Sequence, residues 1–295
     1  MNKDIVIHVS DLTKYYSETL AVDHINFEVN KGEVFGFLGP NGAGKTTTIR
    51  CMMDFIRPSS GSISILGMDS QKKSAEIKNQ VGYLSGDVRL YEKLTGEQHI
   101  KYIEGFRGKA PFVKTLIKKL NFDPKIKVKN LSKGNKQKLA LILALMCKPK
   151  ILIMDEPTAG LDPILQNEIY ETLEKMKSKG ATVFFSSHII SEIERIADRV
   201  GIIKEGRLSK VESIEDLSRK KMRNIEIRFK GKYKISDFKI PGVKRIEKIS
   251  EGILINYVGD INPLLKKLTS YNIAELEISH ASLEDVFLEF YNNKK

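Results

Sequence analysis

The glycine-rich segment Gly39-Pro-Asn-Gly-Ala-Gly-Lys45-Thr46 limits the possible folds more than any other part of the sequence, because it matches G-x-x-x-x-G-K-[ST]. It follows the compact apolar run Val34–Leu38, which predicts a strand, and precedes a helical pattern that extends to Ile56. In a strand–loop–helix unit of this kind, backbone N–H groups and the helix N-terminus converge on a phosphate group. The segment therefore predicts an α/β fold with a phosphate-binding loop.

The residues of this loop have distinct predicted roles toward a nucleotide. The Lys45 ammonium is expected to reach the β- and γ-phosphates, and the Thr46 hydroxyl is expected to bind Mg²⁺. The backbone around them supplies the cradle, which we assign to Gly39, Pro40, Asn41, Gly42, Ala43, Gly44 and Thr47. We therefore expect a nucleotide phosphate and Mg²⁺ as ligands.

A second motif lies at the end of the apolar run Ile151–Met154, which is typical of a buried strand in a parallel sheet. Two acids, Asp155 and Glu156, follow it directly, and buried strands seldom end in adjacent carboxylates that have no partner. Asp155 suits the Mg²⁺ shell, and Glu156 suits activation of an attacking water. The alternative is an N-cap for the next segment. Kinases, GTPases and helicases share both motifs. The two motifs alone therefore predict only a nucleotidase.

The pattern along the chain predicts two domains, residues 1–217 and 218–295. Strands alternate with helices in the first, which gives an α/β core, and its segment from about 92 to 148 is wholly helical, starting at a Thr95–Gln98 capping box. Short strands and a helix from Ser282 predict a small α+β domain in the second. No apolar run is long enough to span a bilayer, and no signal peptide is evident.

Positive charge is concentrated rather than uniform, although the formal net charge is only +12. Residues 101–150 contain thirteen lysines and one arginine against Glu104 and Asp123, and residues 204–248 contain fifteen basic and seven acidic side chains. Such patches favour an acidic partner, a nucleic acid or an anionic lipid surface. A lysine-rich solvated surface is the alternative.

Four further motifs resemble those of the nucleotide-binding subunits of ABC transporters, in family order over about residues 5–210. Asn130-Leu-Ser-Lys-Gly-Asn-Lys-Gln137 stands where that family has its L-S-G-G-Q signature. Ala159-Gly-Leu-Asp162-Pro163 resembles the D-loop, Ser187-His188 the switch histidine, and Leu12-Thr-Lys-Tyr-Tyr16 the strand with the adenine-stacking aromatic. The resemblance implies an ABC ATPase core with an antiparallel β subdomain and an inserted helical subdomain.

The resemblance also implies a head-to-tail homodimer with ATP between the phosphate loop of one subunit and the signature of the other. Ser132 and Gly134 would contact the γ-phosphate across this interface, and Asp162 of the D-loop would also belong to the nucleotide-binding residues. His188 would orient Glu156 and water, and Tyr16 would stack on adenine. Separate permease subunits would form the membrane pathway, which implies a cytoplasmic protein attached to the inner face of the membrane.

The sequence departs from the family pattern at two places. The signature reads Leu-Ser-Lys-Gly-Asn, with Ser132 and Gly134 retained. Gly86 stands where the family has a glutamine that binds Mg²⁺ and senses the membrane subunit. We hypothesise that Asp87 substitutes as a metal ligand, because a carboxylate is a harder oxygen ligand than an amide. The alternative is that Asp87 is only a turn residue.

Two segments resemble the ATPase subunits of ABC-2-type exporters, namely Ala281–Tyr291 and Tyr83-Leu-Ser-Gly-Asp87. We therefore expect an exporter ATPase. The basic patches also permit a non-transport ABC ATPase that acts on nucleic acid or ribosomes. One ATPase module, no sustained heptads and no aromatic residues interleaved with the lysines argue against it, so no nucleic-acid partner is expected. Gly86 raises a third possibility, a catalytically weak regulatory module.

Overall fold

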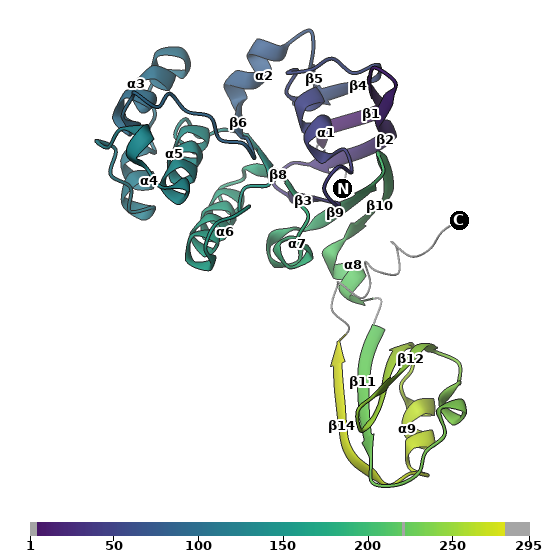
Figure 1. Ribbon diagram of the computed structural model, residues 1–295. Coiled ribbons are helices and arrows are strands. Elements are labelled where there is room, and N and C mark those ends of the chain that lie inside the picture. Colours follow the sequence, from purple (N-terminus) through teal and green to yellow (C-terminus); the bar gives the residue numbers. More distant parts are fainter. Residues whose placement is uncertain (1–4, 220–221, 281–295) are drawn as a thin grey trace. The chain divides into compact units, whose positions relative to one another are not determined.

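The chain divides into two compact units, Met1–Glu212 and Ser213–Lys295. The computed structural model describes residues 5–219 and 222–280 of them (Figure 1). The domain boundary predicted after residue 217 falls within the helix α8 (Ile214–Arg219), a few residues beyond this division. The helix predicted from Ser282 lies outside the described residues. None of the helices in the described ranges has the length and hydrophobicity needed to cross a bilayer.

The first unit contains a four-stranded sheet and a six-stranded sheet. The four-stranded sheet is antiparallel with the order β2-β1-β4-β5, from β1 (Ile5–Tyr16), β2 (Thr19–Asn30), β4 (Ser60–Ile65) and β5 (Met68–Asp69). The six-stranded sheet has the order β10-β9-β3-β8-β7-β6. Its strands are β3 (Val34–Leu38), β6 (Val81–Leu84), β7 (Ile151–Asp155), β8 (Thr182–Ser187), β9 (Arg199–Lys204) and β10 (Arg207–Ser213). Its five strands from β6 to β9 are parallel, as the apolar runs predict.

The helix after the phosphate loop, α1 (Lys45–Met52), is shorter than predicted. The apolar pattern predicts helix to Ile56, but Asp54 takes a left-handed backbone conformation with φ of 51°. This conformation ends a helix, because the chain turns away from the helical axis. The other helices against this core are α2 (Ser74–Gln80), α6 (Pro163–Lys177) and α7 (Ile190–Ile196).

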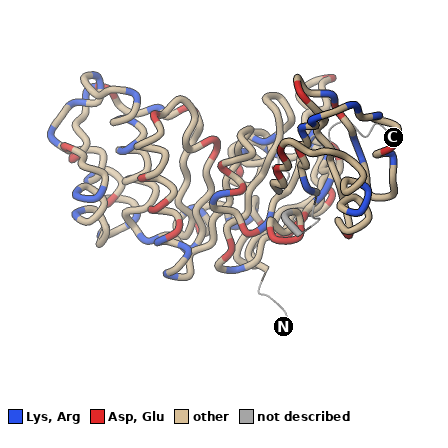
Figure 2. Tube along the Cα trace, turned by 90° about the horizontal axis from the view of Figure 1, so that it is seen from below, with Lys and Arg blue, Asp and Glu red and all other residues tan. Residues whose placement is uncertain are grey.

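The helical segment forms a lobe of its own, at the left of Figure 1. It contains α3 (Gly96–Arg107), α4 (Val113–Lys119), a 3₁₀ turn (Val128–Asn130) and α5 (Lys133–Leu145). The predicted capping box is confirmed: Thr95 Oγ1 accepts from the Gln98 N–H, and the Gln98 side chain accepts from the Thr95 N–H. Figure 2 shows Lys and Arg on several of its helices and turns.

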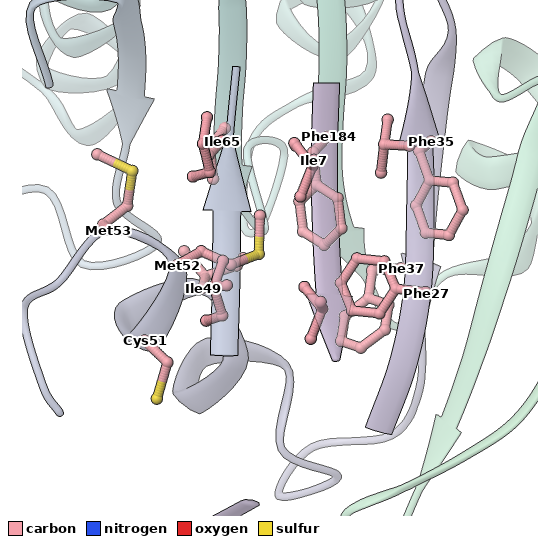
Figure 3. Packing of buried hydrophobic residues seen from close by; sticks show 14 of the residues in the cluster. Ile7, Phe27, Phe35, Phe37, Ile49, Cys51, Met52, Met53, Ile65 and Phe184 are labelled. Atoms are coloured by element: carbon pink, nitrogen blue, oxygen red, sulfur yellow. The ribbon is translucent and has the colours of Figure 1, made fainter. Parts of the chain in front are cut away.

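Four phenylalanines fill the space between the two sheets (Figure 3). Phe27 of β2 stacks on Phe35 of β3 and on Phe184 of β8, with ring centroids 5.6 and 5.9 Å apart, and Phe37 lies 5.5 Å from both Phe27 and Phe184. Each ring buries a large apolar area and fixes its neighbours in offset contact. This core holds β3, and therefore the start of the phosphate loop, against the antiparallel sheet.

The second unit is a four-stranded antiparallel sheet with the order β12-β13-β11-β14. Its elements are β11 (Met222–Phe229), a 3₁₀ turn (Ile235–Phe238), β12 (Val243–Ile249), β13 (Gly252–Val258), α9 (Asn262–Leu268) and β14 (Ile273–His280), after α8. Buried Ile225, Phe238, Ile253 and Leu264 belong to a core that is separate from that of the first unit.

Candidate functional site

The strand register brings the predicted site residues to one edge of the parallel sheet. Leu38 pairs with Ser187, and Asp155 pairs with Ser186, so β3, β7 and β8 end side by side. The chain segments that leave these three carboxyl ends carry the phosphate loop, Glu156 and His188. Ligands of open α/β sheets bind at this edge.

Two glycines allow the phosphate loop to take its shape. A Cβ atom on Gly39 would lie 2.3 Å from the carbonyl oxygen of Ile203, so only glycine fits there. Gly44 has φ of 107°, and a Cβ atom there would lie 2.7 Å from the carbonyl oxygen of Ala21. Gly44 is also the N-cap of α1 and supplies no side-chain acceptor. The first N–H groups of α1 are therefore available to an anion.

Lys45 lies folded back over the loop and is only 5% exposed. Its ammonium group donates to the carbonyl oxygens of Gly39 and Pro40, at 2.6 and 3.0 Å, and lies 3.1 Å from Glu156 Oε1. A buried charge needs such partners, because water no longer solvates it. The ammonium group is thus held within the loop by these three contacts.

Asp155 is buried and accepts two hydroxyl hydrogen bonds. Thr46 Oγ1 donates to its Oδ2 at 2.8 Å, and Ser186 Oγ donates to its Oδ1 at 2.7 Å. The Ser186 hydroxyl also accepts from the N–H of Glu156 at 3.0 Å. A hydroxyl and a carboxylate oxygen side by side are hard donors that suit Mg²⁺.

Glu156 and His188 form a pair at the open side of this cluster. Glu156 Oε2 lies 2.8 Å from His188 Nδ1, while its other oxygen faces Lys45. Glu156 has φ of 46°, a left-handed conformation that is uncommon outside glycine and asparagine. Its side chain thereby stands between a fixed cation and the histidine, which suits a group that accepts a proton from water.

The sequence interpretation missed Glu192, which supports both sides of this pair. It is 5% exposed, and its carboxylate accepts from the hydroxyls of Thr158 and Ser187, the latter at 2.5 Å. Thr158 lies two residues after Glu156, and Ser187 directly precedes His188. Burial raises the pKa of the neighbouring Tyr170, with the Glu192 charge as the next cause. The signal in the sequence is an acid four residues before a buried Ile196 on the same helix face.

The signature residues surround a separate hollow of about 280 Å³, lined by Ser132, Gly134, Asn135, Lys138, Asp162, Ile164, Leu165 and Glu168. Ser132 is the N-cap of α5 and accepts from the Asn135 N–H at 3.2 Å, and Asp162 caps α6 in the same way through the Leu165 N–H at 3.0 Å. Within residues 5–219 and 222–280, no hydrogen bond or ion pair joins these residues to the phosphate loop.

Tyr16 lies exposed at the tip of the β1–β2 hairpin, where it pairs with Thr19. The carbonyl oxygen of Ala21, two residues after Thr19, lies against Gly44 of the phosphate loop. The hairpin tip is therefore next to the loop, at a place where an aromatic ring is accessible to a base.

Gly86 lies against Asp155, whereas the Asp87 side chain pairs with Arg89. A Cβ atom on Gly86 would lie 3.0 Å from the Asp155 carbonyl oxygen and 3.7 Å from its carboxyl carbon. The Asp87 side chain is 71% exposed and pairs with Arg89 at 2.8 Å. In the described part of the chain it has no hydrogen bond to Thr46 or Asp155. Its role at the metal stays a prediction.

A phosphate loop at the carboxyl edge of a parallel sheet, beside a carboxylate–hydroxyl cluster and a Glu–His pair, defines a P-loop nucleoside triphosphatase. The family model of the ABC transporter matches residues 22–159. The chain is 34% identical to the bacitracin transport ATP-binding protein BcrA of Bacillus licheniformis, over 96% of each chain.

The chain is also 34% identical to the linearmycin resistance ATP-binding protein LnrL of Bacillus subtilis, over 72% of this chain and 70% of LnrL. The dimeric structure of the bacterial ABC transporter cassette MJ0796 covers 70% of this chain and 98% of its own at a TM-score of 0.66. That structure is 22% identical and shows the shared fold. The chain belongs to the ABC transporter family, as an ATP-binding and ATP-hydrolysing subunit. This membership supports the transport interpretation over one based on nucleic acid or ribosomes.

Proposed function

We propose that the protein hydrolyses MgATP as a head-to-tail homodimer and thereby drives export by separate permease subunits. The observation that carries the proposal is the linked arrangement of Lys45, Glu156 and His188 at the end of the phosphate loop. It combines a cation for the phosphates, a carboxylate for the attacking water and a histidine that orients the carboxylate.

The contacts of Lys45 suggest how phosphate binding prepares the site. Lys45 holds Glu156 at 3.1 Å, and a triphosphate in the loop competes for the same ammonium group. Once Lys45 turns to the phosphates, His188 is the one charged or polar side-chain partner that Glu156 keeps among residues 5–219 and 222–280. The carboxylate is then free to accept a proton from water. The carboxylate is therefore released for its role when the phosphates arrive.

The pair of Thr46 and Asp155 fits Mg²⁺, because both present oxygen atoms beside the loop. When bound, the ion would neutralise charge on the phosphate oxygens. Ser186 fixes the orientation of Asp155 by donating to its second oxygen. Asp87 would join this set only if its ion pair with Arg89 opened.

The open hollow at the signature supports the dimer. Ser132 and Asp162 line it, and both use their acceptor oxygens for the N-caps, which leaves the Ser132 hydroxyl proton available to a ligand. The exposed Ile164 on its rim offers apolar area to a partner. A second copy that placed its phosphate loop here would bring the γ-phosphate to Ser132 and Gly134. The structure of the related cassette, described as dimeric, supports this arrangement.

A groove of about 550 Å³ between the end of α1, β6 and α5 is our proposed docking site for the permease. Its lining includes the exposed Phe55 and the partly buried Tyr83 and Leu143, with Arg50 and Arg89 also lining it. An amphipathic cytoplasmic loop with an acidic residue fits such a surface. Docking would hold the protein on the inner face of the membrane. The names of the two relatives, for bacitracin transport and linearmycin resistance, support an export role.

The proposal is tested by isolating the protein with its partners from detergent-solubilised cells and measuring ATP turnover. We expect co-purification of a multi-span membrane protein, and ATP turnover that Glu156→Gln lowers by about 10²–10⁴-fold. A Phe55→Ala variant should keep its basal ATP turnover but lose the permease, because Phe55 lines the groove and is not one of the nucleotide-site residues. Co-purification of RNA or DNA in place of a membrane protein would contradict the transport role, and equal turnover of the wild type and Glu156→Gln would contradict hydrolysis at this site.

A further inference from the structure

A cavity of about 220 Å³ lies at the opposite edge of the parallel sheet, where β7 and β8 begin. Its apolar lining comprises Val6, Leu66, Phe112, Pro149, Ile151, Met176 and Ala181. The turns that enter the strands close it, namely Lys148–Lys150 before β7 and Lys179–Ala181 before β8. None of the site residues described above lines this cavity.

Four lysines from three separate turns line the same cavity: Lys31, Lys148, Lys150 and Lys179. In residues 5–219 and 222–280 they form no ion pair with a carboxylate, because the acids that flank this edge have other partners. Glu33 pairs with Arg199 at 3.0 Å, and Asp198 pairs with Lys177 at 2.6 Å. The cavity therefore carries a concentrated and uncompensated positive charge.

The aromatic ring of Phe112 lies close to two of these lysine ammonium groups. The ammonium groups of Lys148 and Lys179 lie 5.6 and 5.2 Å from its ring centroid, within the range of a cation–π contact. Two like charges near one ring repel each other, and an anion between them would offset that repulsion. Lys148 also has φ of 55°, at a position after α5 where glycine or asparagine is usual. A lysine there keeps a charge at the cavity despite its conformational cost.

We propose that this cavity binds a phosphate ester, with the phosphate between Lys148 and Lys179 and the neighbouring apolar part of the ligand against Leu66 and Met176. Lysine suits a phosphate as a compact point charge, and the apolar lining suits a ligand with carbon next to its phosphate. A phospholipid headgroup and a metabolite with a phosphate group share this chemistry. The site is separate from the ATP site and does not rest on the proposed function.

The chain contains no tryptophan, so a single introduced one reports on the cavity alone. We would titrate Phe112→Trp with dihexanoyl phosphatidic acid and, separately, with inorganic pyrophosphate, while saturating ADP occupies the phosphate loop. The expected result is a saturable change in emission. Phe106→Trp, on the 71% exposed Phe106 of α3, is the matched reporter and should show none.

Charge removal tests the two lysines directly. Lys148→Gln with Lys179→Gln should weaken binding about tenfold, because two charge-assisted contacts are lost. The control pair, Lys125→Gln with Lys129→Gln, removes the same charge from exposed positions of the helical lobe and should change affinity less than about twofold. A thermal shift of the wild-type protein by the same ligands gives a second readout that does not depend on Phe112→Trp.

Each outcome decides the proposal. Pyrophosphate as effective as the lipid would overturn the assignment of a phosphate ester, because the apolar lining would then contribute nothing to affinity. Tighter binding of the lipid would support it and assign part of the affinity to the apolar lining. No saturable response in either readout, equal weakening by both lysine pairs, or the same response from Phe106→Trp would overturn it.

Discussion

The two edges of the parallel sheet use charge in opposite ways. At the carboxyl edge, Lys45 is buried and paired with Glu156, and Asp155 accepts from two hydroxyls. At the amino edge, Lys148 and Lys179 share an aromatic ring and have no carboxylate partner within the described residues. One edge holds complete internal contacts that a ligand must replace, while the other holds charge that has no internal counterpart.

This difference follows from what each kind of site must do, namely perform chemistry or only bind a ligand. A site that performs chemistry needs groups held in fixed positions before the substrate arrives, so its charges are paired and oriented. A site that only binds can leave lysines flexible and solvated, because their attraction to an anion does not require one geometry. We therefore expect substitutions at the carboxyl edge to have larger effects on turnover than those at the amino edge.

The largest expected effect is that of Glu156→Gln. The amide cannot accept a proton from water, and general-base contributions are typically about 10²–10⁴-fold. Turnover should fall by about that range. ATP affinity should not fall, because the amide cannot form the ion pair with Lys45 that competes with ATP. Initial rates of phosphate release beside ATP-binding titrations measure both. A loss of affinity as large as the loss of turnover would show that Glu156 serves binding.

Lys45→Ala should give the next largest effect, on binding itself. Removing the ammonium group deletes charge-assisted contacts to the phosphates, each worth about 1.5–3 kcal/mol. We expect ATP affinity to fall by about 100-fold, measured by calorimetric titration in the presence of Mg²⁺. Lys31→Ala, at the amino edge, is the matched control and should leave ATP affinity unchanged. Equal heats of ATP binding for Lys45→Ala and the wild type would show that the phosphate loop does not bind the nucleotide.

Glu192→Ala tests whether the carboxyl edge depends on its supporting contacts. Glu192 joins the segments that carry Glu156 and His188 through Thr158 and Ser187, so its loss should misplace the pair. We expect kcat to fall about tenfold with KM nearly unchanged, since misplaced catalytic groups affect the reaction more than binding. The rates are normalised to the fraction of the protein that binds ATP, so that unfolded protein does not lower the apparent kcat. A fall in that fraction with normal kcat would indicate a purely structural role.

The meeting of the site residues at the carboxyl edge could be predicted from the sequence, because they lie in contiguous motifs that follow strands. Gly39 to Thr46, Asp155 and Glu156 follow strands whose apolar runs identify a parallel sheet, and the common edge follows from that topology. Glu192 escaped because its partners, Thr158 and Ser187, come from other segments and meet it only in three dimensions. The end of α1 was predicted too late because the apolar pattern continues past Asp54, where the backbone turns.

The amino edge could not be predicted for a related reason. Lys31, Lys148 and Lys179 lie far apart in the sequence, and each alone resembles an ordinary solvated lysine. The sequence indicated a basic segment over residues 101–150, but which of its lysines gather at one cavity depends on the strand register. Charge density along the chain therefore predicts a patch, whereas the fold decides the site.

The smallest expected effect concerns Asp87 and asks how far the carboxyl-edge cluster extends. Gly86 stands where the family has a glutamine, and Asp87 is the candidate to bind Mg²⁺ in its place. If it does, Asp87→Ala should raise the Mg²⁺ concentration for half-maximal turnover about threefold, with ATP affinity unchanged. Arg89→Ala is the control, because it frees Asp87 from its ion pair and should lower that concentration. An exposed ion pair contributes about 0–1 kcal/mol, so stability should hardly change in either variant. Identical Mg²⁺ dependence in all three proteins would leave Thr46 and Asp155 as the protein ligands and Asp87 as a surface residue.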